Sequence, residues 1–282
     1  MIQSNTQKTK KYFNNLESRL GYAFVLKGRK HLGFYPEGKE NISTLEAQKL
    51  MEDKLAQKLN VKENALVLDA GCGEGKVAIY LAKEYRFQIK GIDLLDWAIK
   101  NAKQNAAKEG VNQRTEFRVM DYSHLEFPDN TFDAVYTMET LVHAPHYKQV
   151  LHEFHRVLKP KGKLVLFEYS ISPENKIPSK LKKILYQTIQ NAAMPALFHF
   201  THGTFPSILK EAGFTSIEVE DVSLRIIPLL EKFSRYADLP YKMVRLFRLQ
   251  DYFVNATASF LWKDVVKKKI WKHNIVVGTK AS

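Results

Sequence analysis

Apolar runs alternate with amphipathic helical stretches along most of the chain, which is typical of a parallel sheet covered by helices on both faces. A helix is predicted over 44–59, because Leu45, Leu55 and Leu59 recur at helical spacing after a Ser43/Thr44 cap. The predicted strands that follow are 65–69, 87–92, 115–120, 132–138 and 163–168. The helices predicted between them are 76–85, 95–109 and 147–158.

The pattern is less regular after the fifth strand. It predicts helical character at 181–194 within an insertion, a short helix at 205–212, a strand at 216–221, a helical stretch at 226–262 and a final strand at 274–279. We expect one structural domain with an N-terminal helical lid segment (1–60), a cofactor-binding core (61–171) and a remainder (172–282) whose insertions, 172–203 and 224–271, form a substrate lid. Open α/β sheets bind ligands at the carboxyl ends of their strands, below such a lid.

A glycine-rich turn with two acidic partners is the strongest signal in the chain. Gly71, Gly73 and Gly75 follow the first buried strand, where the lack of a Cβ lets a ligand approach the backbone. Asp93 ends the next strand about twenty residues later, where a carboxylate accepts hydrogen bonds from ribose hydroxyls. Asp121 ends the third strand, where it can meet an adenine amine. Together these residues predict a nucleotide-type site.

The turn favours S-adenosylmethionine over a dinucleotide. It reads Gly71-Cys72-Gly73-Glu74-Gly75, which departs from the G-x-G-x-x-G pattern of dinucleotide sites. Glu74 would also repel a pyrophosphate at a helix N-terminus. A sulfonium cofactor carries no phosphate, so acidic residues fit it better.

Two segments resemble class I S-adenosylmethionine-dependent methyltransferases. Residues 66–75 are similar to the family's first motif, and residues 156–163 are similar to its post-helix motif. The resemblance covers 66–170 and implies a Rossmann-like seven-stranded α/β sheet whose last strand inserts antiparallel. It also implies S-adenosyl-L-methionine as cofactor and S-adenosyl-L-homocysteine as product. Lys161 stands where the family usually has glycine. The expected cofactor-binding residues are Asp69, Gly71, Cys72, Gly73, Asp93, Leu94, Asp121, Tyr122 and Glu139.

Two shorter motifs indicate a branch of the family. Residues 138–145 are similar to the Glu-Ala-x-x-His-Ala-Pro segment of sterol C-methyltransferases, and residues 31–38 are similar to the His-Gly-Phe-Tyr region of tocopherol methyltransferases. Both groups place a carbon-bound methyl on isoprenoid-derived substrates. The motifs are shared in part with methyltransferases of small amines and phenols.

Three residues are candidates for the chemistry. Glu168, at the end of the fifth strand, would deprotonate the carbocation left by an alkene acceptor, and sterol methyltransferases carry an acidic residue in a similar place. The alternative is a solvated or salt-bridged glutamate. His143 would be the base for a phenol or alcohol, or a loop histidine bonded to Glu139 or backbone. Tyr35 would close over the cofactor, or simply pack in its loop.

Composition limits the alternatives. No stretch reaches the roughly 20 apolar residues of a membrane span, the first residues lack a signal-peptide core, and the single Cys72 agrees with a reducing cytoplasm. The histidines near 143–155 lack partners at metal-site spacing, so no metal is expected. The net charge of +13 could serve a nucleic acid, an anionic membrane surface or a phosphorylated substrate, but the basic residues are dispersed, which equally suits a Lys-rich solvated surface.

The expected function is methylation of a small apolar acceptor, with carbon methylation of an isoprenoid, sterol or quinone-like molecule favoured. Alternatives are an N- or O-methyltransferase of a phosphobase, sugar or phenol, a nucleic-acid methyltransferase, and a non-catalytic binding module. The apolar residues predicted for the lid are Tyr186, Met194, Leu197, Phe198, Phe200, Tyr241, Met243, Phe247, Tyr252 and Phe253. The sequence leaves the acceptor atom and the oligomeric state open.

Overall fold

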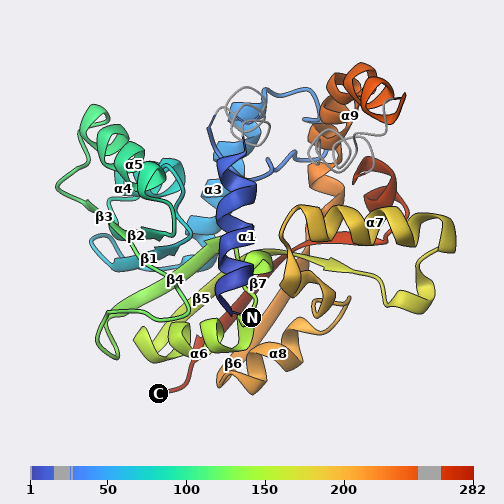
Figure 1. Cartoon of the computed structure of the whole chain (residues 1–282). Coiled ribbons are helices and arrows are strands. Elements are labelled where there is room, and N and C mark those ends of the chain that lie inside the picture. Colours follow the sequence, from blue (N-terminus) through green and yellow to red (C-terminus); the bar gives the residue numbers. More distant parts are fainter. Residues whose placement is uncertain (1, 16–25, 27, 247–261) are drawn as a thin grey trace.

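A mixed sheet of seven strands forms the centre of the molecule (Figure 1). The computed structural model describes residues 2–15, 26, 28–246 and 262–282, with the main chain alone for 2–6, 237–241 and 243–245. The strand order is β3-β2-β1-β4-β5-β7-β6. The strands are β1 (Leu66–Ala70), β2 (Gln88–Asp93), β3 (Thr115–Val119), β4 (Phe132–Met138), β5 (Leu158–Ile171), β6 (Phe214–Asp221) and β7 (Trp271–Lys280).

Strand direction confirms the class I methyltransferase fold. The strands β1 to β5 pair in parallel, whereas β7 inserts antiparallel between β5 and β6. Parallel neighbours need crossover connections, and helices provide them. The central strands β1, β4 and β5 are buried on both faces, which explains why they read as continuous apolar runs.

Helices cover both faces of the sheet (Figure 1). One face carries α4 (Lys76–Glu84) and α5 (Asp96–Lys108), and the other carries α6 (Tyr147–Val157) and α8 (Phe205–Glu211). The helix α3 (Thr44–Leu59) has the predicted bounds, because Ser43 caps it by accepting a hydrogen bond from the amide of Glu46. The remaining helices are α1 (Ile2–Asn14), α7 (Ser179–Asn191) and α9 (Ser223–Leu246), with 3₁₀ turns η1 (Leu141–His143), η2 (Glu174–Lys176) and η3 (Pro195–Phe198).

The strand β5 is longer than predicted. It begins at Leu158 rather than at 163, and residues 159–162 form an irregularity in its pairing with β4. Lys161 has φ +65°, the left-handed region that glycine adopts most easily. That backbone angle fits the glycine that the family resemblance led us to expect at this position.

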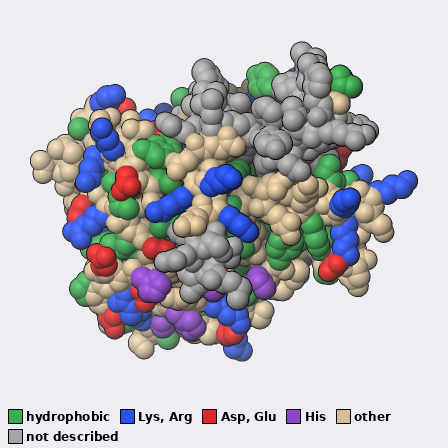
Figure 2. Space-filling view, in the orientation of Figure 1, with side chains coloured by type: hydrophobic (Ala, Val, Ile, Leu, Met, Phe, Trp, Pro, Cys, Tyr) green, Lys and Arg blue, Asp and Glu red, His purple; other side chains and the backbone are tan. Residues whose placement is uncertain are grey.

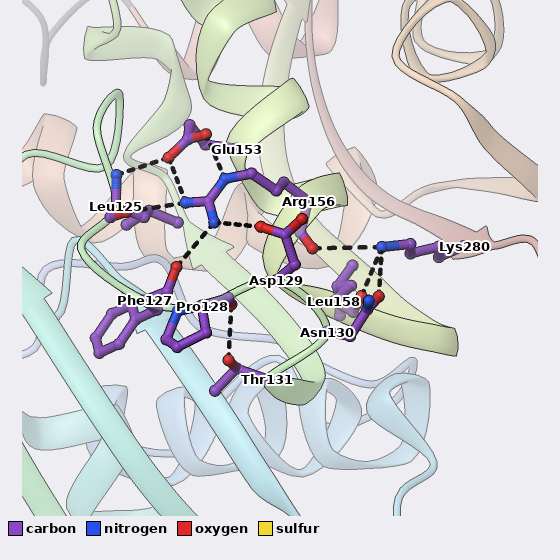
Figure 3. Close-up of polar contacts among 10 residues, drawn as sticks. All are labelled: Leu125, Phe127, Pro128, Asp129, Asn130, Thr131, Glu153, Arg156, Leu158 and Lys280. Carbon is purple, nitrogen blue, oxygen red and sulfur yellow. Dashed lines mark hydrogen bonds and ion pairs between the residues drawn. The ribbon is translucent and has the colours of Figure 1, made fainter.

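Arg156 connects the end of α6 to the loop before β4 (Figure 3). Its guanidinium donates 2.8 Å hydrogen bonds to the main-chain oxygens of Leu125 and Phe127. It also forms ion pairs with Glu153 and Asp129. The loop that leads into β4 is therefore fixed by one side chain, and Glu139 directly follows the other end of β4.

Three helices, α1, α7 and α9, stand apart from the two layers that cover the sheet (Figure 1). The helix α9 contacts β7, and α7 contacts η3. Within the described residues α9 ends at Leu246, and a helical segment resumes at Trp262. Phe247, Tyr252 and Phe253, together with the side chains of Tyr241 and Met243, lie outside the described residues. No described helix has the length and apolar character needed to cross a membrane.

Candidate active site

The glycine turn brings the ends of three strands together. Gly71 has φ +92°, and a Cβ there would lie 2.7 Å from the side chain of Thr140, which follows β4. Thr140 in turn donates a 2.9 Å hydrogen bond from Oγ1 to the oxygen of Ala70. The amides of Gly71 and Cys72 donate to the oxygen of Ile92 in β2. Only glycine permits this contact, so the turn fixes the geometry of the site.

Asp69 lies beneath the turn as a buried carboxylate. Its side chain is almost inaccessible, and burial raises the pKa of its carboxyl to about 7. The nearby hydroxyl of Tyr136 acts to lower this pKa, but no donor among the described residues makes a hydrogen bond of normal geometry to Oδ2. A buried oxygen without a donor is costly unless a ligand supplies one. The site therefore fits a ligand with a cationic donor, such as the ammonium group of S-adenosylmethionine.

Asp93 lies at the end of β2, beside the same turn. Its Oδ2 accepts a 2.9 Å hydrogen bond from the amide of Gly73, and its Oδ1 accepts a 3.0 Å bond from the amide of Leu95. Burial raises the pKa of this carboxyl, while the nearby Lys30 ammonium and the amide donors, including that of Leu94, oppose the rise. The backbone thus orients the carboxylate expected to bind the ribose.

Asp121 and Tyr122 follow β3 at the same edge of the sheet. Asp121 accepts hydrogen bonds from the amide and hydroxyl of Ser123, at 2.8 and 2.6 Å. The hydroxyl of Tyr122 donates a 3.1 Å bond to the oxygen of Thr140. The structure therefore joins the loops after β3 and β4, although the roles of both residues in cofactor binding stay predictions.

Glu139, directly after β4, forms the centre of a buried polar cluster. It adopts φ +61°, a backbone angle that is strained for glutamate. Its Oε1 accepts a 2.8 Å hydrogen bond from the amide of Leu32 and lies 3.3 Å from Nε2 of His273, and its Oε2 accepts from the hydroxyl of Tyr169. Burial acts to raise its pKa, but these neighbours hold the pKa below the usual range, with His273 the strongest. Glu139 is therefore an anion at neutral pH.

His143 lies buried in η1, after β4. Its Nδ1 is 2.8 Å from the oxygen of Ala193, and its ring packs against Tyr12 and Phe13 of α1 at centroid distances of 6.2 and 5.0 Å. Burial lowers the pKa of the imidazole to about 4. A neutral ring that donates from Nδ1 keeps a lone pair on Nε2, as a base requires. Its role as a base stays a prediction.

Glu168 points to the backbone of η1. Its Oε1 accepts hydrogen bonds from the amides of Thr140 and Leu141, at 3.0 and 2.7 Å. The side chain is fully buried, and burial raises the pKa of its carboxyl to about 8. Glu168 thus holds the turn that carries His143, and it is not the solvated glutamate considered as the alternative. A role as base stays a prediction.

Tyr35 packs against α9. Its amide donates a 2.9 Å hydrogen bond to the oxygen of Arg225, and Nζ of Lys232 lies 4.9 Å above its ring. The side chain is buried, with 1% of its surface exposed. These contacts describe a residue that joins the N-terminal region to α9, and its predicted closure over the cofactor stays a prediction.

Lys30 and His273 are residues of the site that no motif or spacing in the sequence predicts. Lys30 lies against Gly73, and Tyr169 and His273 meet at Glu139. Lys30 is more than forty positions away from the turn in the chain, and no spacing rule connects them. In the described part of the chain, no group of three or more His, Cys, Asp or Glu residues is arranged to hold a metal ion.

Comparison with known proteins identifies the family. The methyltransferase domain family matches residues 67–162. The S-adenosyl-L-methionine-dependent Diels-Alderase iccD of Talaromyces variabilis is 32% identical over 280 residues, which cover 96% of this chain and 94% of that protein. The chain belongs to the S-adenosylmethionine-dependent methyltransferases. A second relative of this methyltransferase is a sterol 24-C-methyltransferase of Saccharomyces cerevisiae, 31% identical over 173 residues, which cover 61% of this chain and 45% of that enzyme.

Solved structures agree with the fold of this methyltransferase. The crystal structure of the [4+2]-cyclase SpnF superimposes with a TM-score of 0.72 at 22% identity, covering 93% of this chain and 94% of that one. S-adenosyl-L-methionine is the cofactor, and two features here fit it: the buried Oδ2 of Asp69 and the space beside Gly73, where a Cβ would meet only the side chain of Lys30. When bound, the cofactor supplies an activated methyl group. The protein's part is to hold the acceptor in line with that methyl and to exclude water.

Proposed function

We propose that this methyltransferase transfers a methyl group to a carbon atom of a small apolar acceptor of the isoprenoid class. The observation that carries the proposal is an aromatic cluster beside Glu139, formed by Tyr169, Trp262, Trp271 and His273. The ring of Tyr169 lies 5.1 Å from Trp271, 5.3 Å from His273 and 6.2 Å from Trp262, centroid to centroid. The cluster lies where β5 ends and β7 begins.

The chemistry of an alkene acceptor matches this arrangement. The π electrons of the alkene form a new C–C bond as the S–CH₃ bond breaks, which leaves a carbocation on the acceptor. Aromatic faces stabilise a cation by about 0.5–2 kcal/mol each. The carbocation then loses a proton to a base, and Glu139 is the carboxylate in contact with the cluster. A phosphorylated acceptor would instead require Lys or Arg at this position.

The sterol 24-C-methyltransferase relative supports a carbon acceptor. The similarity covers only part of either chain, so it supports the kind of atom that is methylated and not the size of the acceptor. The surface gives little support for a nucleic-acid substrate. Figure 2 shows Lys and Arg side chains in small separate groups on this face, whereas a nucleic-acid site needs a continuous basic track.

Cyclisation without methyl transfer is a second candidate, favoured by the relative that covers nearly the whole chain. That protein is named a Diels-Alderase, and the structural neighbour SpnF is a [4+2]-cyclase. A cycloaddition moves no proton and needs no base. It would use the same aromatic surroundings to hold a polyene in a folded conformation.

One assay separates the candidates. The protein is incubated with labelled S-adenosylmethionine and a panel of sterol, prenyl diphosphate, quinone, polyene, phosphobase, phenol and RNA acceptors. We expect label on a carbon atom, one CH₂ unit of added mass and S-adenosylhomocysteine as the second product. A product of unchanged mass without S-adenosylhomocysteine would establish cyclisation instead. Label on oxygen, nitrogen or RNA would refute both candidates.

Variants of the aromatic cluster test its role. We expect Trp271→Leu to slow methyl transfer about 10-fold or more, because one ring face is removed from the cation. Cofactor affinity should not change, because two strands, β4 and β5, separate β7 from β1, which leads into the glycine turn. The matched control is Tyr85→Leu, which removes an aromatic ring at the end of α4. Equal effects of the two substitutions would refute the assignment of the cluster.

We also propose that the acceptor is collected from an anionic membrane surface. Three large apolar side chains of α9, Leu224, Tyr236 and Leu246, are each at least 71% exposed. Apolar side chains among Lys and Arg residues are the combination that binds anionic bilayers. Sedimentation with phosphatidylglycerol vesicles, but not phosphatidylcholine vesicles, is the expected result, and Tyr236→Ser should weaken it. Equal sedimentation of the variant would refute this surface.

A further inference from the structure

Lys30 is a cation that the fold directs into the cofactor site. It belongs to a segment, residues 28–36, that we call the strap. A Cβ at Gly73 would lie 3.7 Å from Nζ of Lys30, so the ammonium group rests against the glycine turn. Nζ also lies 4.8 Å from the ring centroid of Trp97 and 5.3 Å from that of Phe13. The side chain therefore lies between the turn, the start of α5 and α1.

The residues on either side of Lys30 are firmly anchored. Arg29 donates a 2.7 Å hydrogen bond from Nε to the buried carboxylate of Glu52, and Nε2 of His31 lies 3.0 Å from the same oxygen. The amide of Leu32 then bonds Glu139. Lys30 is consequently presented by a fixed main chain, which lowers the entropic cost of holding a flexible side chain in place.

The positive charge of Lys30 is unexpected in a site for S-adenosylmethionine, because the cofactor itself carries more positive than negative groups. S-adenosylmethionine has a positive sulfonium and a positive ammonium group, and both favour acidic surroundings such as Asp69. Its carboxylate is the single negative group. It is therefore the one group of the cofactor that the ammonium of Lys30 attracts, whereas the sulfonium and the ammonium are repelled. The ammonium of Lys30 lies close to the glycine turn and acts electrostatically on Asp93, whose carboxylate bonds the same turn.

We propose that Lys30 binds the carboxylate of the cofactor's methionine moiety. The strap thereby selects a cofactor that carries a carboxylate, and the two anionic residues of the turn region bind its cationic and ribose parts. The aromatic rings of Trp97 and Phe13 hold the ammonium group by cation–π contact from the sides. Lys30 is thus a specificity-determining residue for the cofactor, contributed by the N-terminal segment.

Isothermal titration of the full chain with two ligands tests the proposal. The ligands are S-adenosylmethionine and its decarboxylated form, which differ only in the carboxylate. The wild-type chain should bind S-adenosylmethionine more tightly. Lys30→Met, which keeps the length and apolar contacts of the side chain, should weaken S-adenosylmethionine binding about 10- to 100-fold, as expected for a charge-assisted hydrogen bond. It should leave binding of the decarboxylated form nearly unchanged.

Each other outcome overturns the proposal. Equal weakening of both ligands would mean that Lys30 only supports the packing of Trp97 and Phe13. Tighter binding of both would mean that Lys30 blocks the site. Unchanged affinity for both ligands would show that Lys30 does not bind the carboxylate of the cofactor. The matched control is Lys49→Met, since Lys49 also lies over an aromatic ring, at 5.9 Å from Tyr80, but on α3. Failure of the wild-type chain to bind S-adenosylmethionine would contradict the cofactor itself and is distinguished in the same titration.

Discussion

The Nδ1 atom of His143 lies 2.8 Å from the main-chain oxygen of Ala193, although fifty residues separate the two in the chain. His143 follows β4 and Ala193 follows α7 in the insertion after β5. This contact joins the edge of the cofactor site to the insertion. It also fixes the tautomer of the imidazole, because an amide oxygen accepts only from a protonated nitrogen.

The pH dependence of catalysis follows from this burial. The pKa of His143 is lowered to about 4, so the ring stays neutral through the physiological range. We expect kcat/KM to show no titration step near pH 6.5. A step near pH 6.5 that disappears in His143→Asn would contradict the expectation.

The pH dependence of stability should also reflect the titration of His143. As the pH falls, His143 is protonated near pH 6.5 in the unfolded chain but only near pH 4 in the folded chain. Protonation therefore favours the unfolded chain, and the free energy of unfolding falls as the pH drops from about 6.5 to about 4. Thermal unfolding of wild type and of His143→Asn over this pH range measures the difference in stability between the two proteins. The stability advantage of the wild type should become smaller toward acid pH. A constant difference would show that His143 does not titrate in this way.

Replacement of Asp93 by Ala should weaken S-adenosylmethionine binding at least about 10-fold, because two hydrogen bonds from the ribose are lost. Asp93→Asn keeps one acceptor oxygen, so its affinity for S-adenosylmethionine should lie between that of wild type and that of Asp93→Ala. Titration calorimetry measures both variants. Since Asp93 also accepts from the amides of Gly73 and Leu95, circular dichroism should confirm that each variant is folded. Unchanged affinity in Asp93→Ala would refute the ribose assignment.

Glu168→Gln should make the protein more stable than wild type above pH 8. The pKa of Glu168 is raised by burial to about 8, so the neutral form is favoured in the folded state. Its contribution is therefore fully present below about pH 4.5 and is lost as the pH rises through about 8. Glutamine stays neutral, and the gain should reach about 1–3 kcal/mol at alkaline pH. A stability difference independent of pH would show that Glu168 is ionised throughout.

Arg156→Lys should destabilise the fold by about 1–3 kcal/mol. Lysine cannot reproduce the planar set of donors that bonds Leu125, Phe127 and the two carboxylates together. Urea unfolding followed by circular dichroism measures the change. The control is Arg118→Lys in an exposed ion pair with Glu116, which should change stability by less than about 0.5 kcal/mol. Equal effects of the two substitutions would show that the contacts in Figure 3 add little.

The sequence by itself determined the sheet and the cofactor. Buried strands read as apolar runs because both faces of β1 and β4 are covered, and glycine was required where Gly71 approaches Thr140. Asp69 and Asp93 were predictable because the carboxyl ends of parallel strands meet at one edge of the sheet. The family motifs added the antiparallel β7, which the structure confirms.

Only the tertiary structure decided which side chains meet at Glu139. Successive residues of a strand point to opposite faces, so Glu168 turns to the amides of η1 while Tyr169 meets Glu139 and the aromatic cluster. The sequence could not say which face the lid covers. Lys30 depends on packing alone, because the strap is placed by Glu52 and Glu139, which lie far from it in the chain. Local patterns specify strands and turns, whereas the side chains that converge from distant segments are set by how those segments pack.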